Sequence, residues 1–269
     1  MSRDSFLQTV SVIDTETTNL DPAKAEIVEI AGATYNGHSW LVSDMLLGSV
    51  NRIPPEASAK NHISQRMIAG LPIFSESVDK VKVVLGWDNR YIVAHNCQYD
   101  QTVLAVAWET SGLSDDTEKA VDRSNWICTH RLSKHLLHGV DFPDMQYNLN
   151  YLRYKLDLPI PDDTVSHRAG ADTLTCAILF EFLLDYAIAT GAVCDNHTVG
   201  DQLVNLCWSP IKMKSWPFGK NKGRLLSEIE TDYYMWAIGN MDSLNEDYES
   251  YDPDLAASVA SELESRINA

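Results

Sequence analysis

Hydrophobic and β-branched residues predict a buried strand near the start of the chain. Residues 9–13 read Thr-Val-Ser-Val-Ile, a composition typical of strands. The strand leads into Asp14 and Glu16, whose side chains share one face because strand residues alternate between faces. Two neighbouring carboxylates repel each other, and burying them without a partner is costly. A divalent cation and a polar strand end in water explain Asp-x-Glu equally well, so the rest of the chain must decide.

The next stretch predicts an antiparallel meander that begins with this strand. Residues 26–35 form the second expected strand, and Asn36-Gly37 directly after it is a strong signal for a tight hairpin turn. Residues 39–46 then return as a third strand. The first strand, which carries the two carboxylates, therefore belongs to a sheet of at least three strands.

Strand and helix patterns alternate over the following 150 residues. We expect strands at 91–94 and 126–129, a helix that follows the segment 95–100 and runs through about residue 108, and further helices at 64–69, 74–85, 131–137, 145–156 and 169–190. In the last of these helices, Leu174, Ile178 and Phe182 have helical spacing and are expected to face the core. Strands followed by alternating strands and helices predict an α/β layered domain, residues 1–190.

The pattern changes after residue 190. Residues 191–213 form a connector with a short helical pattern at 199–206, and residues 214–250 form a small α+β module. This module is expected to open with a turn between two short strands at 216–223, followed by helical segments at 225–229 and 233–238. Asp252-Pro253 predicts the start of an amphipathic helix in the final segment, residues 251–269.

Composition and charge narrow the function classes. The 269 residues are 45% apolar, enough for one large and one small domain. With 21 basic and 38 acidic residues the net charge is −17, which argues against non-specific coating of a nucleic acid but not against an enzyme that holds one through metals. No apolar stretch suggests a membrane span or export signal. Five widely spaced cysteines suggest neither zinc nor disulfides and fit a reducing cytoplasm.

Two further carboxylates and a histidine lie at expected element ends. Asp100 follows a strand-to-helix turn, and Asp172 lies about one turn into the long helix, five residues after His167. Four carboxylates can hold two Mg²⁺ or Mn²⁺ ions, typically about 3.5–4 Å apart in two-metal sites. A histidine with a pKa near neutrality can take a proton from the attacking water.

Three motifs bring these residues together in order: Asp14-Thr15-Glu16-Thr17-Thr18, Ala94-His95-Asn96-Cys97-Gln98-Tyr99-Asp100 and His167-Arg168-Ala169-Gly170-Ala171-Asp172. The sequence thereby resembles the DnaQ-like 3′–5′ exonucleases of the DEDDh type. One departure is Asn19, where the family usually has glycine, although asparagine also tolerates left-handed backbone geometry. The segments 126–129, 218–223 and 233–236 further resemble the exodeoxyribonuclease X branch of the family, which carries a C-terminal extension.

The resemblance implies a ribonuclease-H-like fold, with a mixed central sheet flanked by helices, and stepwise release of 5′-mononucleotides from DNA 3′ ends in repair, recombination or degradation. It assigns the metal-ligand and catalytic roles to Asp14, Glu16, Asp100 and Asp172, and the general-base role to His167. Single-stranded DNA or the 3′ ends of duplex DNA would be the substrate. Candidate substrate contacts are Thr15, Thr17, His62 and Asn96, although His95 and Asn96 are also expected to orient the turn before Asp100.

Other readings remain open. The same chemistry suits an RNA-trimming exonuclease, because local contacts to the 2′-hydroxyl decide the sugar. A proofreading partner of a polymerase or an inactive nucleic-acid-binding module would share the fold, although a complete catalytic set counts against the inactive module. We expect His130, His135 and His138 near the surface, and the acidic run 242–254 on a solvated face.

A basic and aromatic segment stands out in the small module. It contains the cations Lys212, Lys214, Lys220, Lys222 and Arg224, interleaved with Trp216 and Phe218. Basic groups beside aromatic rings suit single-stranded nucleic acid, in which bases stack on rings and phosphates pair with cations. A small hairpin with ordinary surface lysines explains the segment as well. Lys220 and Lys222 are our candidate DNA contacts here.

Overall fold

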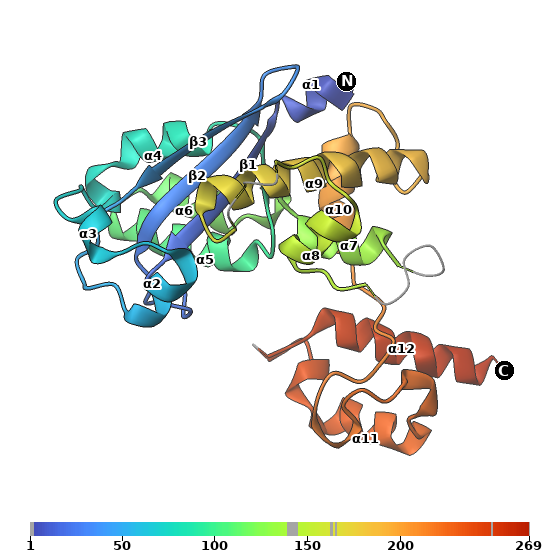
Figure 1. The fold of residues 1–269 in the computed structure, drawn as a ribbon. Coiled ribbons are helices and arrows are strands. Elements are labelled where there is room, and N and C mark those ends of the chain that lie inside the picture. The colour runs from blue at the N-terminus through green and yellow to red at the C-terminus, as the bar shows by residue number, and fades with distance from the viewer. Residues whose placement is uncertain (1–2, 139–144, 162–163, 165, 249, 269) are drawn as a thin grey trace. The chain divides into compact units, whose positions relative to one another are not determined.

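A five-stranded mixed sheet forms the centre of the first of two structural units (Figure 1). The computed structural model describes residues 3–138, 145–161, 164, 166–248 and 250–268. The units span residues 1–207 and 208–269. In the order β3-β2-β1-β4-β5, the strands are β1 (Val10–Thr17), β2 (Ile27–Tyr35), β3 (Trp40–Leu46), β4 (Tyr91–Ala94) and β5 (Trp126–Cys128).

β1 lies in the middle of the sheet and joins its two halves. It pairs antiparallel with β2 and parallel with β4, while β3 and β5 extend the two sides. Val10, Val12 and Ile13 are buried, which accounts for the apolar composition of this strand. The predicted meander is confirmed, and the register places Glu16 opposite Glu29 on β2. Cross-strand partners share a face, so these two acids lie near each other.

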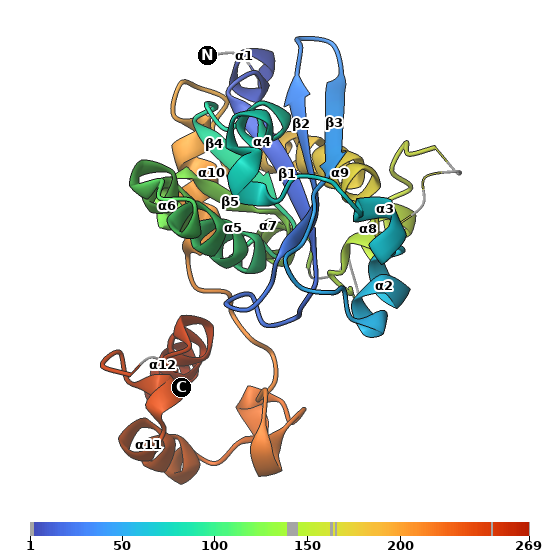
Figure 2. The same cartoon turned by 90° about the vertical axis from the view of Figure 1, so that its left-hand side faces the viewer.

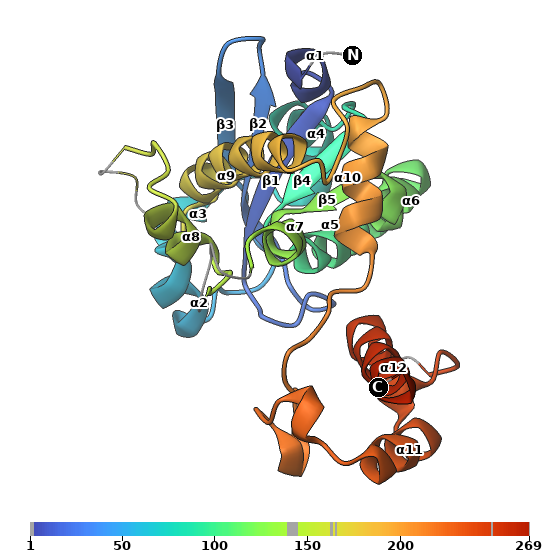
Figure 3. The same ribbon diagram turned by 90° about the vertical axis from the view of Figure 1, so that its right-hand side faces the viewer.

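Helices cover both faces of this sheet. The helix α4 (Val78–Leu85) packs on β2, and α5 (Gln98–Thr110) and α6 (Ser114–Val121) lie on the same side (Figure 2). The opposite face carries α9 (Ala169–Ala189), with α7 (Thr129–Leu136), α8 (Leu149–Lys155) and α10 (Val199–Trp208) (Figure 3). Gly32 permits the close approach of α4, because a Cβ there would lie 2.2 Å from the Val84 carbonyl oxygen.

Short elements complete the first unit. They are α1 (Arg3–Leu7), α2 (Pro55–Asn61), α3 (Gln65–Ile68) and the 3₁₀ turns Phe74–Glu76 and Arg123–Asn125. Phe6 and Leu7 bury α1 against the core, and α3 packs through Ile68. Among the described residues, no helix combines the length and apolar character needed to cross a membrane.

The second unit has its own small core. It contains α11 (Thr231–Asn240), α12 (Pro253–Ile267) and the 3₁₀ turns Gly219–Asn221, Leu226–Glu228 and Asp242–Leu244. The core is built from Trp216, Leu226, Ile229, Tyr234, Ala237, Leu255 and Val259. Asp252 caps α12, as predicted, by accepting hydrogen bonds from the backbone N–H groups of Asp254 and Leu255. The C-terminal helix is thus part of this unit and not a separate segment.

Several predicted elements differ from the structure. Instead of two short strands around residues 216–223, the second unit has a single β-bridge between Ser215 and Leu225. The segment expected to be helical at 225–229 forms only the short 3₁₀ turn. The predicted helix 145–156 begins at Leu149, because the Asn148 side chain accepts a hydrogen bond from Tyr151 N–H and caps it there. The first unit continues past residue 190, because α10 buries Val199, Leu203 and Cys207 in it.

The buried face of α9 also differs from the predicted one. Leu174, Ile178 and Phe182 are only partly buried, whereas the fully buried positions include Cys176 and Phe180. The helix is apolar on most of its circumference, so spacing alone does not select the face that meets the sheet. The prediction that this stripe forms the core is therefore wrong, although the helix itself is confirmed.

Candidate active site

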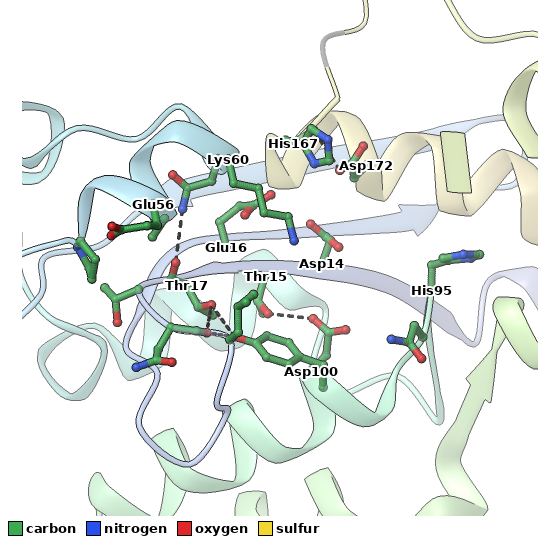
Figure 4. Close-up of a pocket in the computed structure, with 18 residues that line it drawn as sticks. Asp14, Thr15, Glu16, Thr17, Glu56, Lys60, His95, Asp100, His167 and Asp172 are labelled. Carbon is green, nitrogen blue, oxygen red and sulfur yellow. Dashed lines mark hydrogen bonds between the residues drawn. The ribbon is translucent and has the colours of Figure 1, made fainter. Parts of the chain in front are cut away.

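Three carboxylates from two elements meet at one end of the central strand. Asp14 and Glu16 extend from β1, and Asp172 extends from the first turn of α9 (Figure 4). One oxygen of each group lies within 4.8 Å of an oxygen of the others, close enough to share a metal ion. The alternation of β1 brings Asp14 and Glu16 to the same side, and the packing of α9 on β1 and β2 adds the third acid. The cluster lines a cavity of about 710 Å³.

The fourth predicted acid lines the same cavity from another helix. Asp100, in the first turn of α5, is only 5% exposed and accepts a hydrogen bond from the Thr15 hydroxyl at 2.8 Å. Thr15 lies between Asp14 and Glu16 on β1, so this bond ties the second motif to the first. The structure thus brings all four predicted acids and His167 to one cavity.

Burial and mutual repulsion raise the pKa values of the acids. Burial raises the pKa of Glu16 to about 7, and the nearby charges of Asp172 and Glu29 add to the effect. Burial also raises the pKa of Asp100 to about 7, although the Thr15 hydrogen bond opposes this. The pKa of Asp14 lies well above its usual range for the same reason, with the charge of Asp100 as the next cause. Such a cluster favours either protons or a metal cation.

His167 stands at the mouth of the cavity, directly before α9. Its backbone is in the left-handed region with φ of +64°, and its N–H donates to the Asp172 carboxylate at 3.1 Å. This hydrogen bond lowers the pKa of Asp172, against the larger effect of burial, which raises it. The imidazole is among the groups that line the cavity (Figure 4). A side chain at this position can reach a water at the acid cluster.

Hydrogen bonds shape the loop that follows β1. The Thr17 hydroxyl contacts the Tyr99 hydroxyl at 2.5 Å and donates to the Asn19 carbonyl oxygen at 3.0 Å. Tyr99 also donates to Asn19. Thr15 and Thr17 therefore line the cavity in positions set by α5, and Asn19, at the position where the family usually has glycine, is part of the same network.

The remaining predicted contacts are placed as follows. Asn96 lines the cavity with φ of +62° in the turn before α5, next to His95. His95 bonds through its two ring nitrogens to the Thr129 hydroxyl and the Tyr147 carbonyl oxygen, each at 2.9 Å. Burial lowers the pKa of His95 to about 4, which keeps the ring neutral. These contacts support the predicted role of this histidine in orienting the turn.

His62 and the lysines lie elsewhere. His62 is exposed at the end of α2 and is not among the residues that line the cavity, whereas its neighbours Lys60 and Asn61 are. Lys220 and Lys222 are exposed residues of the second unit. Their roles, and that of His62, stay predictions.

Sequence reasoning missed part of the cavity wall. Lys60, Asn61 and Tyr99 line it, together with Pro54 and Glu56. The charge of Lys60 lowers the pKa of Glu16, and the Asn61 amide donates to the Thr17 carbonyl oxygen at 3.3 Å. Tyr99 belongs to the second motif but was given no role of its own, whereas residues 54–61 have no motif and their one local signal is the Pro54-Pro55 pair at the start of α2.

Two of the three histidines expected near the surface are half-buried, and the third is exposed. His130 is half-buried, its ring centre lies 5.6 Å from that of His95, and burial lowers its pKa to about 4. His138 is exposed, as predicted, and His135 is half-buried. His130 is the second residue of α7, and packing against His95, in the turn that precedes Asp100, explains its burial.

Comparison with known proteins identifies the family. A family model described as RNase_T, Exonuclease, matches residues 11–180, which include every predicted acid and His167. The chain belongs to this exonuclease family. Its predicted membership of the DnaQ-like 3′–5′ exonucleases and its ribonuclease-H-like sheet are thereby confirmed.

Individual relatives carry the same domain. The chain is 27% identical over 240 residues to Exodeoxyribonuclease 10 of Escherichia coli strain K12, covering 87% of this chain and 92% of the relative. It is 28% identical over 189 residues to the DNA polymerase III subunit epsilon of Treponema pallidum, covering 70% and 81%. A solved structure of Exonuclease X in complex with 5′ overhanging duplex DNA matches with a TM-score of 0.52 at 23% identity, covering 74% of this chain and 99% of that one.

Proposed function

We propose that this exonuclease is a metal-dependent 3′–5′ exodeoxyribonuclease that releases 5′-mononucleotides from DNA ends. The observation that carries this proposal is the cluster of Asp14, Glu16 and Asp172 oxygens within 4.8 Å, in a chain of the exonuclease family. The DNA substrate is supported by the similarity to Exodeoxyribonuclease 10 over almost the full length of both chains. DNA repair, recombination or degradation would use such an activity.

The donor set fits divalent cations. All four acids offer hard oxygen ligands of the kind that Mg²⁺ and Mn²⁺ prefer, and burial raises the pKa of each, so a bound cation would favour their charged form. Asp14, Glu16, Asp100 and Asp172 would hold two ions. When bound, these ions would supply Lewis-acid chemistry by activating a water and stabilising charge on the leaving oxygen.

The protein side chains orient the substrate and move protons. His167, at the mouth of the cavity, would accept the proton of the attacking water as general base. Thr15 and Thr17 would position the terminal nucleotide from the strand, with Asn96 on the opposite turn. His62 would contact the strand farther out.

A cleavage assay with matched substrates tests the activity. The full chain is given a 5′-labelled DNA oligonucleotide and its RNA counterpart, with Mg²⁺, with Mn²⁺ and with chelator. We expect a ladder that shortens from the 3′ end, faster on DNA, and absent both with chelator and in the Asp14→Asn variant. A faster ladder on RNA would replace the DNA assignment by RNA trimming.

The control separates catalysis from binding. If no metal supports cleavage while the oligonucleotide still binds, the chain is an inactive nucleic-acid-binding module and the proposal fails. Cleavage by Asp14→Asn at the rate of the unaltered chain would overturn the metal-ligand assignment. The exposed substitution Lys80→Gln on α4 is a matched surface control for losses caused by handling or folding.

A further inference from the structure

A local excess of positive charge marks the start of the second unit. Residues 209–227 contain five lysines and arginines and no acidic residue, in a chain whose net charge is −17. All four lysines of this segment are exposed, and none of them forms an ion pair with another described residue. Single solvated lysines are ordinary, but four lysines in a segment that itself contains no acidic residue create a local field that attracts anions.

A tight ribbon presents two of these lysines. Trp216 N–H donates to the Arg224 carbonyl oxygen at 2.9 Å, and Gly223 N–H donates to the Trp216 carbonyl oxygen at 2.8 Å. Gly219 and Gly223 adopt φ of +62° and +82°, which turns the chain back on itself. The Asn221 side chain is buried and accepts a hydrogen bond from Arg224 at 3.1 Å. Lys220 and Lys222 flank this anchored residue and are therefore held on a built turn.

Aromatic rings continue from the ribbon onto α11. Trp216 is fully buried, and the ring centres of Phe218 and Tyr233 lie 5.6 Å and 5.2 Å from it. Tyr233 in turn lies 5.5 Å from Trp236. Phe218 is 38% exposed and Trp236 51% exposed, so the two ends of this ring cluster face water. The Lys220 ammonium group lies 5.1 Å from the Tyr233 ring centre, which places a cation among the rings.

We propose that Phe218, Lys220, Lys222 and Trp236, together the ribbon surface, bind single-stranded nucleic acid. Exposed rings accept stacked bases of any sequence, and lysines beside them pair with the phosphates that connect those bases. Charge complementarity selects this occupant, because exposed apolar rings alone would suit many partners. The inference rests on the proposed function, since the bound strand is the substrate of the nuclease unit on the same chain. Covalent linkage raises the effective concentration of that strand at the cavity.

Binding without turnover tests the ribbon surface. The full chain is titrated against a 5′-fluorescent oligothymidylate in chelator, and anisotropy gives Kd at several salt concentrations. For Lys220→Glu/Lys222→Glu we expect Kd to rise at least about tenfold at low salt. The slope of log K against log salt is expected to be smaller by about 1.4, because the variant loses two phosphate contacts to a single strand. For Trp236→Ala we expect Kd to rise about 5- to 150-fold with an unchanged slope.

A matched reversal controls for general charge. Lys80→Glu, on an exposed position of α4, changes the net charge as much as each of the two substitutions in the double reversal. It is expected to leave Kd and the salt slope unaltered. An unchanged Kd in the double reversal or in Trp236→Ala, or an equal loss in Lys80→Glu, overturns the ribbon surface as a nucleic-acid site. Each variant is expected to fold, because all the substituted side chains are exposed. Circular dichroism checks this.

Cleavage kinetics separate this inference from the proposed function. With metal present, the double reversal is expected to raise KM on a long oligonucleotide while kcat stays within about twofold of the unaltered chain, since uniform binding is lost and chemistry is not. If the unaltered chain does not cleave the oligonucleotide, the proposed function is wrong. The binding measurement without metal still shows whether the ribbon surface binds nucleic acid. A drop in kcat without a change in KM would overturn the assignment of these residues to strand binding.

Discussion

The Arg168 guanidinium group forms a salt bridge with the Glu29 carboxylate directly beside the acid cluster. Glu29, on β2, is 1% exposed and accepts hydrogen bonds from Arg168 Nη2 at 2.5 Å and from Arg168 Nε at 3.1 Å. The Ala169 backbone N–H donates to the same carboxylate at 2.9 Å. Because Glu29 lies opposite Glu16 in the sheet, the pair fixes the first turn of α9, and hence Asp172, against the strand that carries Asp14 and Glu16.

We expect Arg168→Met to destabilise the metal-free protein by about 3 kcal/mol, because it leaves a buried carboxylate without its cation. The same change would add one uncompensated negative charge next to Glu16 and shift Asp172, so kcat/KM at limiting metal would fall. Urea unfolding in chelator measures the stability, and a metal titration of the cleavage rate measures the second effect.

The double variant Glu29→Gln/Arg168→Met tests whether the unpaired Glu29 charge causes the loss of stability. It removes both charges, so it is expected to recover most of the free energy of unfolding lost in the single variant. Arg168→Lys keeps the charge but not the forked donor geometry and is expected to lie between the two. Equal losses in the single and double variants would show that packing, and not charge pairing, gives Arg168 its effect.

The proposed site residues were predictable where the pattern is local in sequence. The period of one strand places Asp14 and Glu16 on one face, one helix start places His167 near Asp172, and the resemblance to the DEDDh exonucleases implied their shared role. The contact of Glu29 with Arg168 joins residues 139 positions apart, and no local sequence pattern predicts this contact. Long-range pairs of this kind depend on the strand register and on the docking angle of α9, which only the folded chain shows.

Differences between the predictions and the structure have physical causes. The wrong core stripe on α9 arose because nearly every side of that helix is apolar, so the sheet decides which side is buried. His62, whose left-handed φ of +60° marks the C-terminal cap of α2, is not among the residues that line the cavity, and its substrate contact stays a prediction. In the second unit the strand pattern was too short to form more than one bridge.

Removing a ligand acid separates catalysis from stability. Asp14→Asn and Asp172→Asn are expected to abolish metal-dependent turnover while leaving the metal-free fold intact or more stable, because each removes one of several repelling charges. For a domain of this size each kcal/mol of relieved repulsion corresponds to a rise in Tm of about 2–4 °C. Thermal unfolding in chelator and calorimetric titration with Mn²⁺ check both parts. Unchanged Mn²⁺ binding in Asp172→Asn would contradict its role as a ligand.

His167→Ala is expected to slow the chemical step by about 10²–10⁴-fold, because no other described side chain at the cavity mouth replaces the imidazole. KM is expected to change little. His167→Asn is the matched control, since asparagine tolerates the positive φ of this position but is not a base. A variant with asparagine that retains the full rate would show that the backbone, and not the ring, is what the reaction requires.

The raised carboxyl pKa values predict how stability depends on pH. Burial raises the pKa of Glu16 and that of Asp100 to about 7 each, whereas unfolded carboxyl groups titrate at about 4. Between these values the folded metal-free protein binds more protons than the unfolded chain, so the contribution to stability is complete below pH 4 and is lost as the pH rises through 7. We therefore expect Tm in chelator to fall between pH 5 and pH 8, and Glu16→Gln to flatten this dependence.

Metal addition is expected to reverse the effect. Mg²⁺ or Mn²⁺ competes with protons for the same carboxylates, so the rise in Tm at a fixed metal concentration would be largest at pH 8 and small at pH 5. Calorimetric scans at both pH values, with metal and with chelator, measure the four Tm values needed, and Asp14→Asn serves as the variant with weakened metal binding. If metal raises Tm equally at pH 5 and pH 8, the acids with raised pKa values are not the groups that bind it.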